Sequence, residues 1–239
     1  MHAPPVFPSV DAEIRALLGH GLIVYPAYNS ERRRVARLDA LLAQDVGGCR
    51  ARINAPSEEL WLERALAHLC MEAIAVLLYH GADPSLSQRL GHRHLFDQVA
   101  TLPTLPAVRA YFYALLNVGP DRAPVDRAEG RDVNAWLDPV AAPMPALTLA
   151  VTSRQPFVVR WLLRGRHADV NAIDLIHGQQ HNAMFWALHG LDEDWRAGRA
   201  FPPAALGILR LLRAHGADMA QWWDRFPEVC HTLRRQSGG

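Results

Sequence analysis

Apolar residues recur with the period of an α-helix in several stretches of this chain. Between residues 106 and 116 they fall at i, i+3, i+4, i+7 and i+8, which places them on one face of a helix; they are Val108, Tyr111, Phe112, Leu115 and Leu116. A second stretch, residues 31–43, follows Ser30, whose hydroxyl can cap a helix. Its three arginines, residues 32–34, are expected on the solvated side.

Three of the predicted helices end in the same way. The segments 77–83, 162–169 and 211–218 each run from a Leu-Leu pair to an Ala-Asp pair, with Gly81 and Gly216 directly before that pair in two of them. Glycine adopts a positive φ at little steric cost, so these positions are expected to end the helix. A repeated helix end indicates a stack of similar units.

The residues that follow the helix ends also repeat. The segments 132–135 and 169–172 both read Asp-Val-Asn-Ala. The spacing between Asp83, Asp132, Asp169 and Asp218 exceeds about 33 residues, the length of a unit made of a turn and two helices, so loops are expected between the helices. Each of three second helices is expected to begin at a proline, where a missing N–H costs little; these are Pro106, Pro156 and Pro203.

The segments 145–151, 157–163 and 168–172 together resemble an ankyrin repeat. The signature of that family is Thr-Pro-Leu-His-x-Ala-Ala, then a Val-Val-x-x-Leu-Leu helix, then Gly-Ala-Asp-Val-Asn, and here Pro145 and Ala146 stand at the Thr and Pro positions. The resemblance implies an all-α fold, an ankyrin-type helical solenoid of about four to five divergent helix-turn-helix units with capping helices at both ends.

The expected organisation is a Pro-rich tail at 1–10 and a single ankyrin-repeat domain at 11–239. A short helix at 11–18 is expected to cover the first unit. The approximate units are 11–50, 51–86, 87–134, 135–171 and 172–219, followed by a C-terminal cap at 220–239.

Composition excludes some classes of function. A net charge of +1 gives no global field for a polyanion, so no nucleic-acid partner is expected. No apolar run of about 18 residues and no conventional signal sequence are visible, so we expect no membrane association and a cytoplasmic location. Lysine is absent and alanine is abundant, a usage typical of GC-rich bacterial genomes. Export by a secretion system that needs no conventional signal stays open.

Several residues could support chemistry, and each has a simpler explanation. Cys49, Cys70 and Cys230 match no metal or disulfide spacing, and neither His68 nor His231 is spaced to share a helix face with a thiol. His177 and His181 flank an expected turn without a carboxylate or cysteine to complete a metal site. The acidic residues 192–194 are expected in a solvated loop, and His80 and His215 are expected to bond carbonyls at helix ends. No catalytic residue, metal or cofactor is predicted.

The resemblance to ankyrin repeats implies a partner surface on the turns and first helices. The residues at those positions are Gln88, Arg89, His92, Trp136, Asp138, Val140, Thr152, Ser153, Ile173, Leu175, Ile176, Gln179, His181 and His189. Large apolar side chains at turn tips, such as Trp136 and Ile173, suit contact with a partner. The alternative is that the longer turns fold back and pack on one another.

The sequence therefore predicts a non-catalytic protein-protein interaction module that binds another protein. Two biological uses stay open: an exported bacterial effector that binds a host protein, or an immunity or antitoxin-like inhibitor of a toxin. A Cys/His or metal-dependent enzyme is a remote third alternative.

Overall fold

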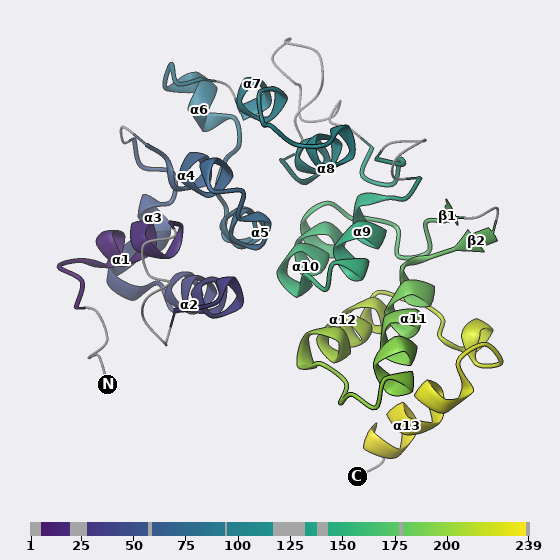
Figure 1. Cartoon of the computed structure of the whole chain (residues 1–239). Helices are drawn as coiled ribbons and strands as arrows, with labels where there is room; N and C mark the ends of the chain where they lie inside the picture. Colours follow the sequence, from purple (N-terminus) through teal and green to yellow (C-terminus); the bar gives the residue numbers. More distant parts are fainter. Residues whose placement is uncertain are drawn as a thin grey trace. The chain divides into compact units, whose positions relative to one another are not determined.

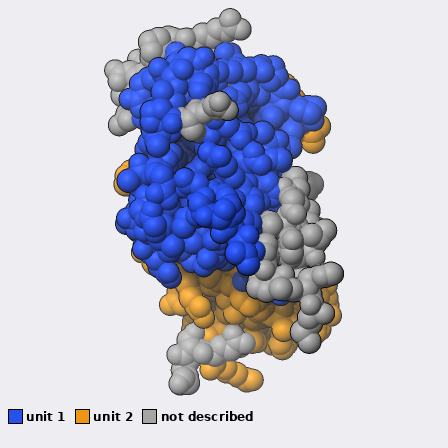
Figure 2. Space-filling view, turned by 90° about the vertical axis from the view of Figure 1, so that its left-hand side faces the viewer, with its two compact units in different colours: residues 1–104, 116–131 blue, residues 105–115, 132–239 orange. Residues whose placement is uncertain are grey.

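The structure, a computed structural model, describes residues 6–19, 28–56, 59–93, 95–116, 132–137, 143–176 and 179–237. Within these ranges the chain forms α-helices and one short two-stranded hairpin (Figure 1). The chain divides into two compact units, coloured separately in Figure 2. Unit 1 comprises residues 1–104 and 116–131, and unit 2 comprises residues 105–115 and 132–239.

Unit 1 is built from two helix pairs. Helix α1 (Val10–Leu17) packs on α2 (Glu31–Ala43), and α4 (Trp61–Ala67) packs on α5 (Met71–Tyr79). The pairs meet with α1 against α4 and α2 against α5. The first helices therefore lie together, and so do the second helices.

Unit 2 repeats this arrangement. Helix α9 (Ala146–Thr152) packs on α10 (Pro156–Gly165), and α11 (Ala183–Arg196) packs on α12 (Pro203–Ala214). Helix α9 again lies against α11, and α10 lies against α12. Helix α13 (Pro227–Ser237) packs on α11 and covers the end of the unit.

Helix α8 (Pro106–Leu116) carries the apolar stripe predicted from the sequence, and four of its five side chains are buried while Val108 is half-buried. The hydroxyl of Tyr111 donates to Gln155 Oε1 at 3.2 Å, immediately before α10. Helices α8, α10 and α12 begin at the three prolines, as predicted. Short elements in the connections are η1 (Val46–Gly48), α3 (Cys49–Arg52), α6 (Leu86–Arg89), α7 (Leu95–Ala100) and η2 (Ala220–Trp222).

The repeated helix ends have the predicted backbone. Gly81 and Gly216 have φ of 97° and 88°. In both cases the amide of the next alanine donates to a helical carbonyl five residues earlier, at 2.9 and 3.1 Å, which satisfies a carbonyl that the helix leaves free. In the third copy His167 takes this left-handed conformation, with φ of 51°.

The aspartates that mark the repeats each make the same type of hydrogen bond. Asp83, Asp132, Asp169 and Asp218 each accept the backbone amide two residues later on Oδ1, at 2.7 to 2.9 Å. This bond closes a tight turn without help from regular secondary structure. The same turn therefore recurs after four different segments of the chain.

Asparagines join consecutive turns inside each unit. Asn54 Oδ1 accepts the amide of Asp83 at 2.9 Å, and Asn134 Oδ1 accepts the amide of Asp169 at 2.8 Å. The first of these turns was not predicted, because an arginine precedes it where the other copies have aspartate. The signal was the tripeptide 53–55, Ile-Asn-Ala, which matches the Val-Asn-Ala of the later copies.

The prediction of a mostly helical chain is confirmed, with one local difference. Residues 174–181, expected as a turn, form the antiparallel strands β1 (Asp174–Ile176) and β2 (Gln179–His181), with Asp174 opposite His181. The segment between two helices is long enough here to fold back on itself and pair its own backbone. Within the described ranges, no helix combines the length and apolarity needed to cross a membrane.

Two polar residues behave differently from the prediction. Arg34 was expected in solvent, but it is 5% exposed and its Nη1 donates to the carbonyl of Tyr28 at 3.3 Å. His80 was expected to bond a carbonyl at its helix end, but its Nε2 lies 2.9 Å from Asp39 Oδ1 on α2. The neighbouring helix supplies its partner.

His215 matches the prediction made for it. Its Nδ1 lies 2.9 Å from the carbonyl oxygen of Leu211, one turn earlier in α12. The imidazole therefore contacts a carbonyl in the last turn of the helix, which also accepts the backbone amide of His215 at 3.2 Å.

Replacing Asn134 tests the bond between turns. Asn134→Ala removes the acceptor of the Asp169 amide, so the free energy of unfolding should fall by about 0.5–1.5 kcal/mol. Asn171→Ala is the matched control, because that side chain is exposed and joins no second turn among the described residues. Equal losses in urea unfolding of the two variants would contradict the proposed role.

Candidate functional site

The predicted site residues of unit 1 differ in how far the fold already uses them. Gln88 and Arg89 are exposed on α6, and Arg89 forms an ion pair with Asp83 of the repeated turn. His92 is half-buried, with Nδ1 3.1 Å from both carboxylate oxygens of Glu63 on α4. Two of these three side chains therefore have partners in the fold.

The apolar turn tips of unit 2 are partly packed. The indole N–H of Trp136 donates to the carbonyl of Ile173 at 3.0 Å, and Leu137 is 3% exposed. The side chain of Ile173 is 49% exposed. The turns therefore contact one another, as the alternative interpretation expected, and contact of the exposed Ile173 with a partner stays a prediction.

Some predicted site residues lie outside the described part of the chain. These are Asp138 and Val140, together with the side chains of Leu175, Ile176 and Gln179, whose strand backbone is described. Their role in binding stays a prediction.

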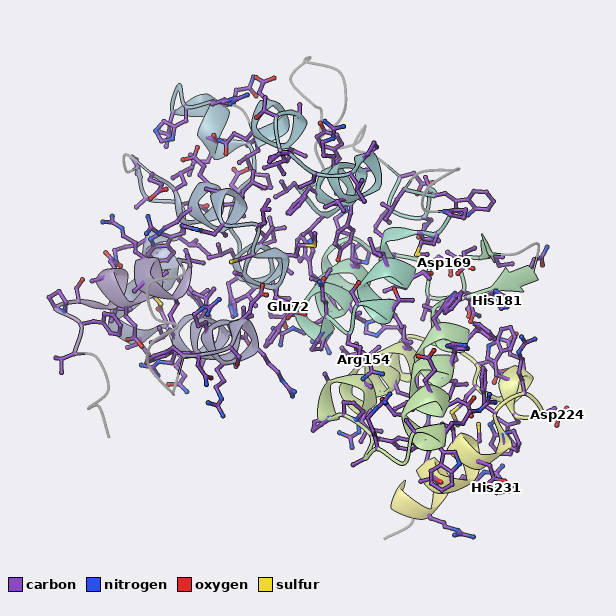
Figure 3. The ribbon with its side chains drawn as sticks, viewed as in Figure 1. Glu72, Arg154, Asp169, His181, Asp224 and His231 are labelled. Atoms are coloured by element: carbon purple, nitrogen blue, oxygen red, sulfur yellow. The ribbon has the colours of Figure 1, made fainter. Side chains whose placement is uncertain are left out.

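His181 was expected at an exposed position, and this is wrong, because it is 7% exposed. Its ring stacks on Phe185 with 3.9 Å between centroids, and its Nδ1 lies 3.8 Å from Asp174 Oδ1. Strand β2 ends at His181, two residues before α11 begins, so the imidazole lies against Phe185 in the first turn of that helix. Figure 3 labels His181 at this end of α11.

Asp174 is a fully buried carboxylate at the base of the hairpin. Its Oδ2 accepts the indole N–H of Trp186 at 2.9 Å. Burial raises the pKa of this carboxyl, and hydrogen bonds from Trp186 and Thr148 offset part of that rise. The bond to Asp174 holds the indole of Trp186 in one orientation on α11.

A pocket of about 200 Å³ opens where α9, α11 and α12 meet. Its apolar wall is formed by Val151, Trp186, Ala187, Ala205 and Ile208. Its other lining residues are Thr152, Arg154, His189, Gly190 and Glu193. The structure thus brings together Thr152 and His189, which the sequence predicted, while Ser153 is an exposed neighbour.

Two partly exposed arginines beside the pocket pair with one buried aspartate. The Nη2 of Arg154, a residue labelled in Figure 3, donates to Asp194 Oδ2 at 2.8 Å and to the carbonyl of Gly190 at 3.1 Å. Arg199 Nε donates to Asp194 Oδ1 at 2.9 Å. The segment 192–194 was predicted as a solvated loop, but it is helical, and Asp194 is 2% exposed. The arginine forty residues earlier in the chain makes this burial tolerable.

Two residues of the pocket depart from local conformational preference. Arg154 follows α9 with φ of 54°, a left-handed conformation that favours glycine. After α11, the residue in this conformation is a glycine, Gly198. Gly190 lies inside α11, where glycine is less favourable than alanine by about 0.5–1 kcal/mol. A Cβ at Gly190 would meet only Arg154 Nη2, at an ordinary contact distance of 3.7 Å.

The three cysteines are buried. Burial raises the pKa of Cys70 to about 11, with a further contribution from Glu31, and burial also raises the pKa of Cys49 and Cys230. Cys230 lines a second hollow of about 280 Å³ together with the exposed His231, labelled in Figure 3. These thiols stay protonated near neutral pH.

Within the described ranges, no group of three or more His, Cys, Asp or Glu side chains could hold a metal ion. Comparison with protein-family models gives no match to this chain, and comparison with curated protein sequences gives none either. The geometry of the site is therefore the basis for the function proposed below.

Removing the carboxylate of Asp194 should destabilise unit 2. Asp194→Ala leaves two guanidinium groups unpaired, and because both are partly exposed we expect a loss of about 2–3 kcal/mol. The matched control is Asp192→Ala on the same helix, which breaks an i,i+4 pair with the exposed Arg196 and should cost below about 1 kcal/mol. Chemical denaturation measures both losses, and similar values would contradict this assignment.

Adding a methyl group at Gly190 should stabilise the protein. Gly190→Ala meets no close neighbour and restricts the unfolded chain, so the free energy of unfolding should rise by about 0.5–1 kcal/mol. Gly207→Ala in α12, where a Cβ would meet nothing within 4 Å, is the reference. A lower melting temperature for Gly190→Ala alone would show that this position is tighter than described.

The raised pKa of Asp174 predicts a pH dependence. The carboxyl of Asp174 titrates at about 3.9 in the unfolded chain and at a higher pH in the folded protein. As the pH falls, the folded protein therefore binds this proton first. Asp174 therefore stabilises the fold more as the pH falls towards the unfolded value. The free energy of unfolding of the wild type minus that of Asp174→Asn should grow as the pH is lowered from 7 to 4.5. A difference that stays constant over this range would contradict the effect of burial on the pKa.

Proposed function

We propose that this chain is a divergent ankyrin-repeat protein that acts as a non-catalytic protein-protein interaction module. The partner surface of unit 2 is the pocket formed by α9, α11 and α12 together with its exposed border, Thr152, Ser153 and His189. Family membership and binding are both part of this proposal.

The observation that carries the proposal is the repeated unit of turn, helix and helix. In each compact unit, first helices pack on first helices and second helices on second helices, and four turns that precede or follow these pairs have the same aspartate hydrogen bond. Arrays of this kind leave turn and first-helix side chains for recognition. The exposed Thr152 and Ser153 at the end of α9 fit that use.

Position-specific photocrosslinking in cells of the source organism tests the proposal. A photoreactive phenylalanine analogue at Ser153 should yield one major crosslinked protein. The same analogue at Arg213, which is exposed on α12 and outside the pocket, should not. No crosslinked protein, or the same products from both positions, would contradict the proposed surface.

A further inference from the structure

We propose that the pocket between α9, α11 and α12 binds a partner polypeptide through an acidic side chain, held by Arg154, and an adjacent bulky apolar side chain. This inference rests on the proposed function and specifies the partner chemistry of the same surface. Its parts are the volume of the pocket, the free donors of Arg154 and the apolar wall.

The volume favours a side chain over a cofactor or drug-sized molecule. Small-molecule sites in proteins usually enclose about 300–1,000 Å³, and this pocket encloses about 200 Å³. A partner segment that lies across the opening can fill it with one or two side chains. An exposed pocket of this size is typical of anchor positions in protein interfaces.

Arg154 offers a positioned positive charge. Its Nη2 donates to Asp194 and to the carbonyl of Gly190, while its Nε and Nη1 have no hydrogen-bond partner among the described residues and the side chain is 37% exposed. Asp194 is shared with Arg199, so these three groups carry one excess positive charge. The N–H groups of Nε and Nη1 point away from these partners, and each can donate a charge-assisted hydrogen bond to a carboxylate oxygen.

Two residues that build this geometry are unfavourable for local structure. An arginine takes a left-handed conformation that favours glycine, and its guanidinium contacts the carbonyl of a glycine inside a helix. A side chain larger than alanine at Gly190 would occupy the space beside Arg154. Departures from local preference that meet at one pocket are expected where function selects the residues.

The apolar wall of the pocket, like the guanidinium of Arg154, is fixed by a hydrogen bond to a buried carboxylate. Trp186 lines the pocket, and its indole N–H is fixed by the buried Asp174 at 2.9 Å. Val151 and Ile208 complete the wall from α9 and α12. A preorganised apolar wall beside a fixed guanidinium lowers the ordering cost of binding.

Glu193 is the opposing charge at the pocket. Its side chain is 63% exposed and lies 3.9 Å from His189 Nδ1, so solvent and ions screen it more than they screen Arg154. It should weaken the binding of an acidic peptide only slightly. Glu193→Gln should therefore tighten that binding by up to about threefold.

Selection from a phage-displayed library of random nonapeptides on the full chain tests the proposal. Peptides enriched on the wild type should share Asp or Glu next to Leu, Ile, Met or Phe. The control Arg213→Gln should select the same motif. Gly190→Leu, which fills the pocket while favouring the helix, should select nothing above background, whereas Gly207→Leu should behave as the wild type.

Fluorescence polarisation of one enriched peptide then isolates the charge contact. Replacing its acidic residue by the amide should weaken binding to the wild type by about tenfold or more. The same replacement should change binding to Arg154→Gln by less than about twofold, because the partner of the acidic residue is then absent. This double-mutant cycle also cancels any effect of Arg154→Gln on folding.

Each contrary outcome is distinct. Enriched peptides without an acidic residue, no enrichment on the wild type, or equal effects of the amide replacement on both proteins would overturn the pocket assignment. The proposed function would survive these results if the crosslink at Ser153 is obtained, and it would fail separately if that crosslink is absent.

Discussion

The fold depends on short helices burying their apolar faces against neighbouring pairs. Helices α4 and α9 have seven residues each, and isolated helices below about 12–15 residues are marginal in water. Packing α9 on both α10 and α11 removes Leu147, Ala150 and Val151 from solvent. The helices are therefore stable because of their neighbours. The surface available to a partner is the part of each helix that this packing leaves exposed.

Hydrogen bonds at the connections fix how the pairs are spaced. The repeated aspartate closes each turn within itself, and Asn54 and Asn134 join one turn to the next. At the other end of the helices, Arg154 and Asp194 connect the loop after α9 with α11. Unit 2 thus has polar contacts at both ends of its helices and an apolar interior between them.

Local rules predicted much of the fold. Three helix starts followed from prolines and two helix ends from glycines, because each is decided by the backbone of one or two residues. The hairpin at 174–181 and the burial of His181 could not be predicted, since both depend on how that segment folds back on Trp186. The burial of Asp194 depends on Arg154, which is distant in sequence, so reading residues 192–194 alone gave a solvated loop. Of the site, Thr152 and His189 were predicted, whereas Arg154 and Gly190 were not, since their role is visible only once two helices are placed together.

The most direct test of mutual burial is the helix content of one isolated helix pair. Far-UV circular dichroism of a peptide spanning residues 143–171, which contains α9 and α10, should show a mostly unfolded chain at 25 °C. Helix content close to that of the same residues in the structure would contradict the account, because it would show that the pair folds without its neighbours.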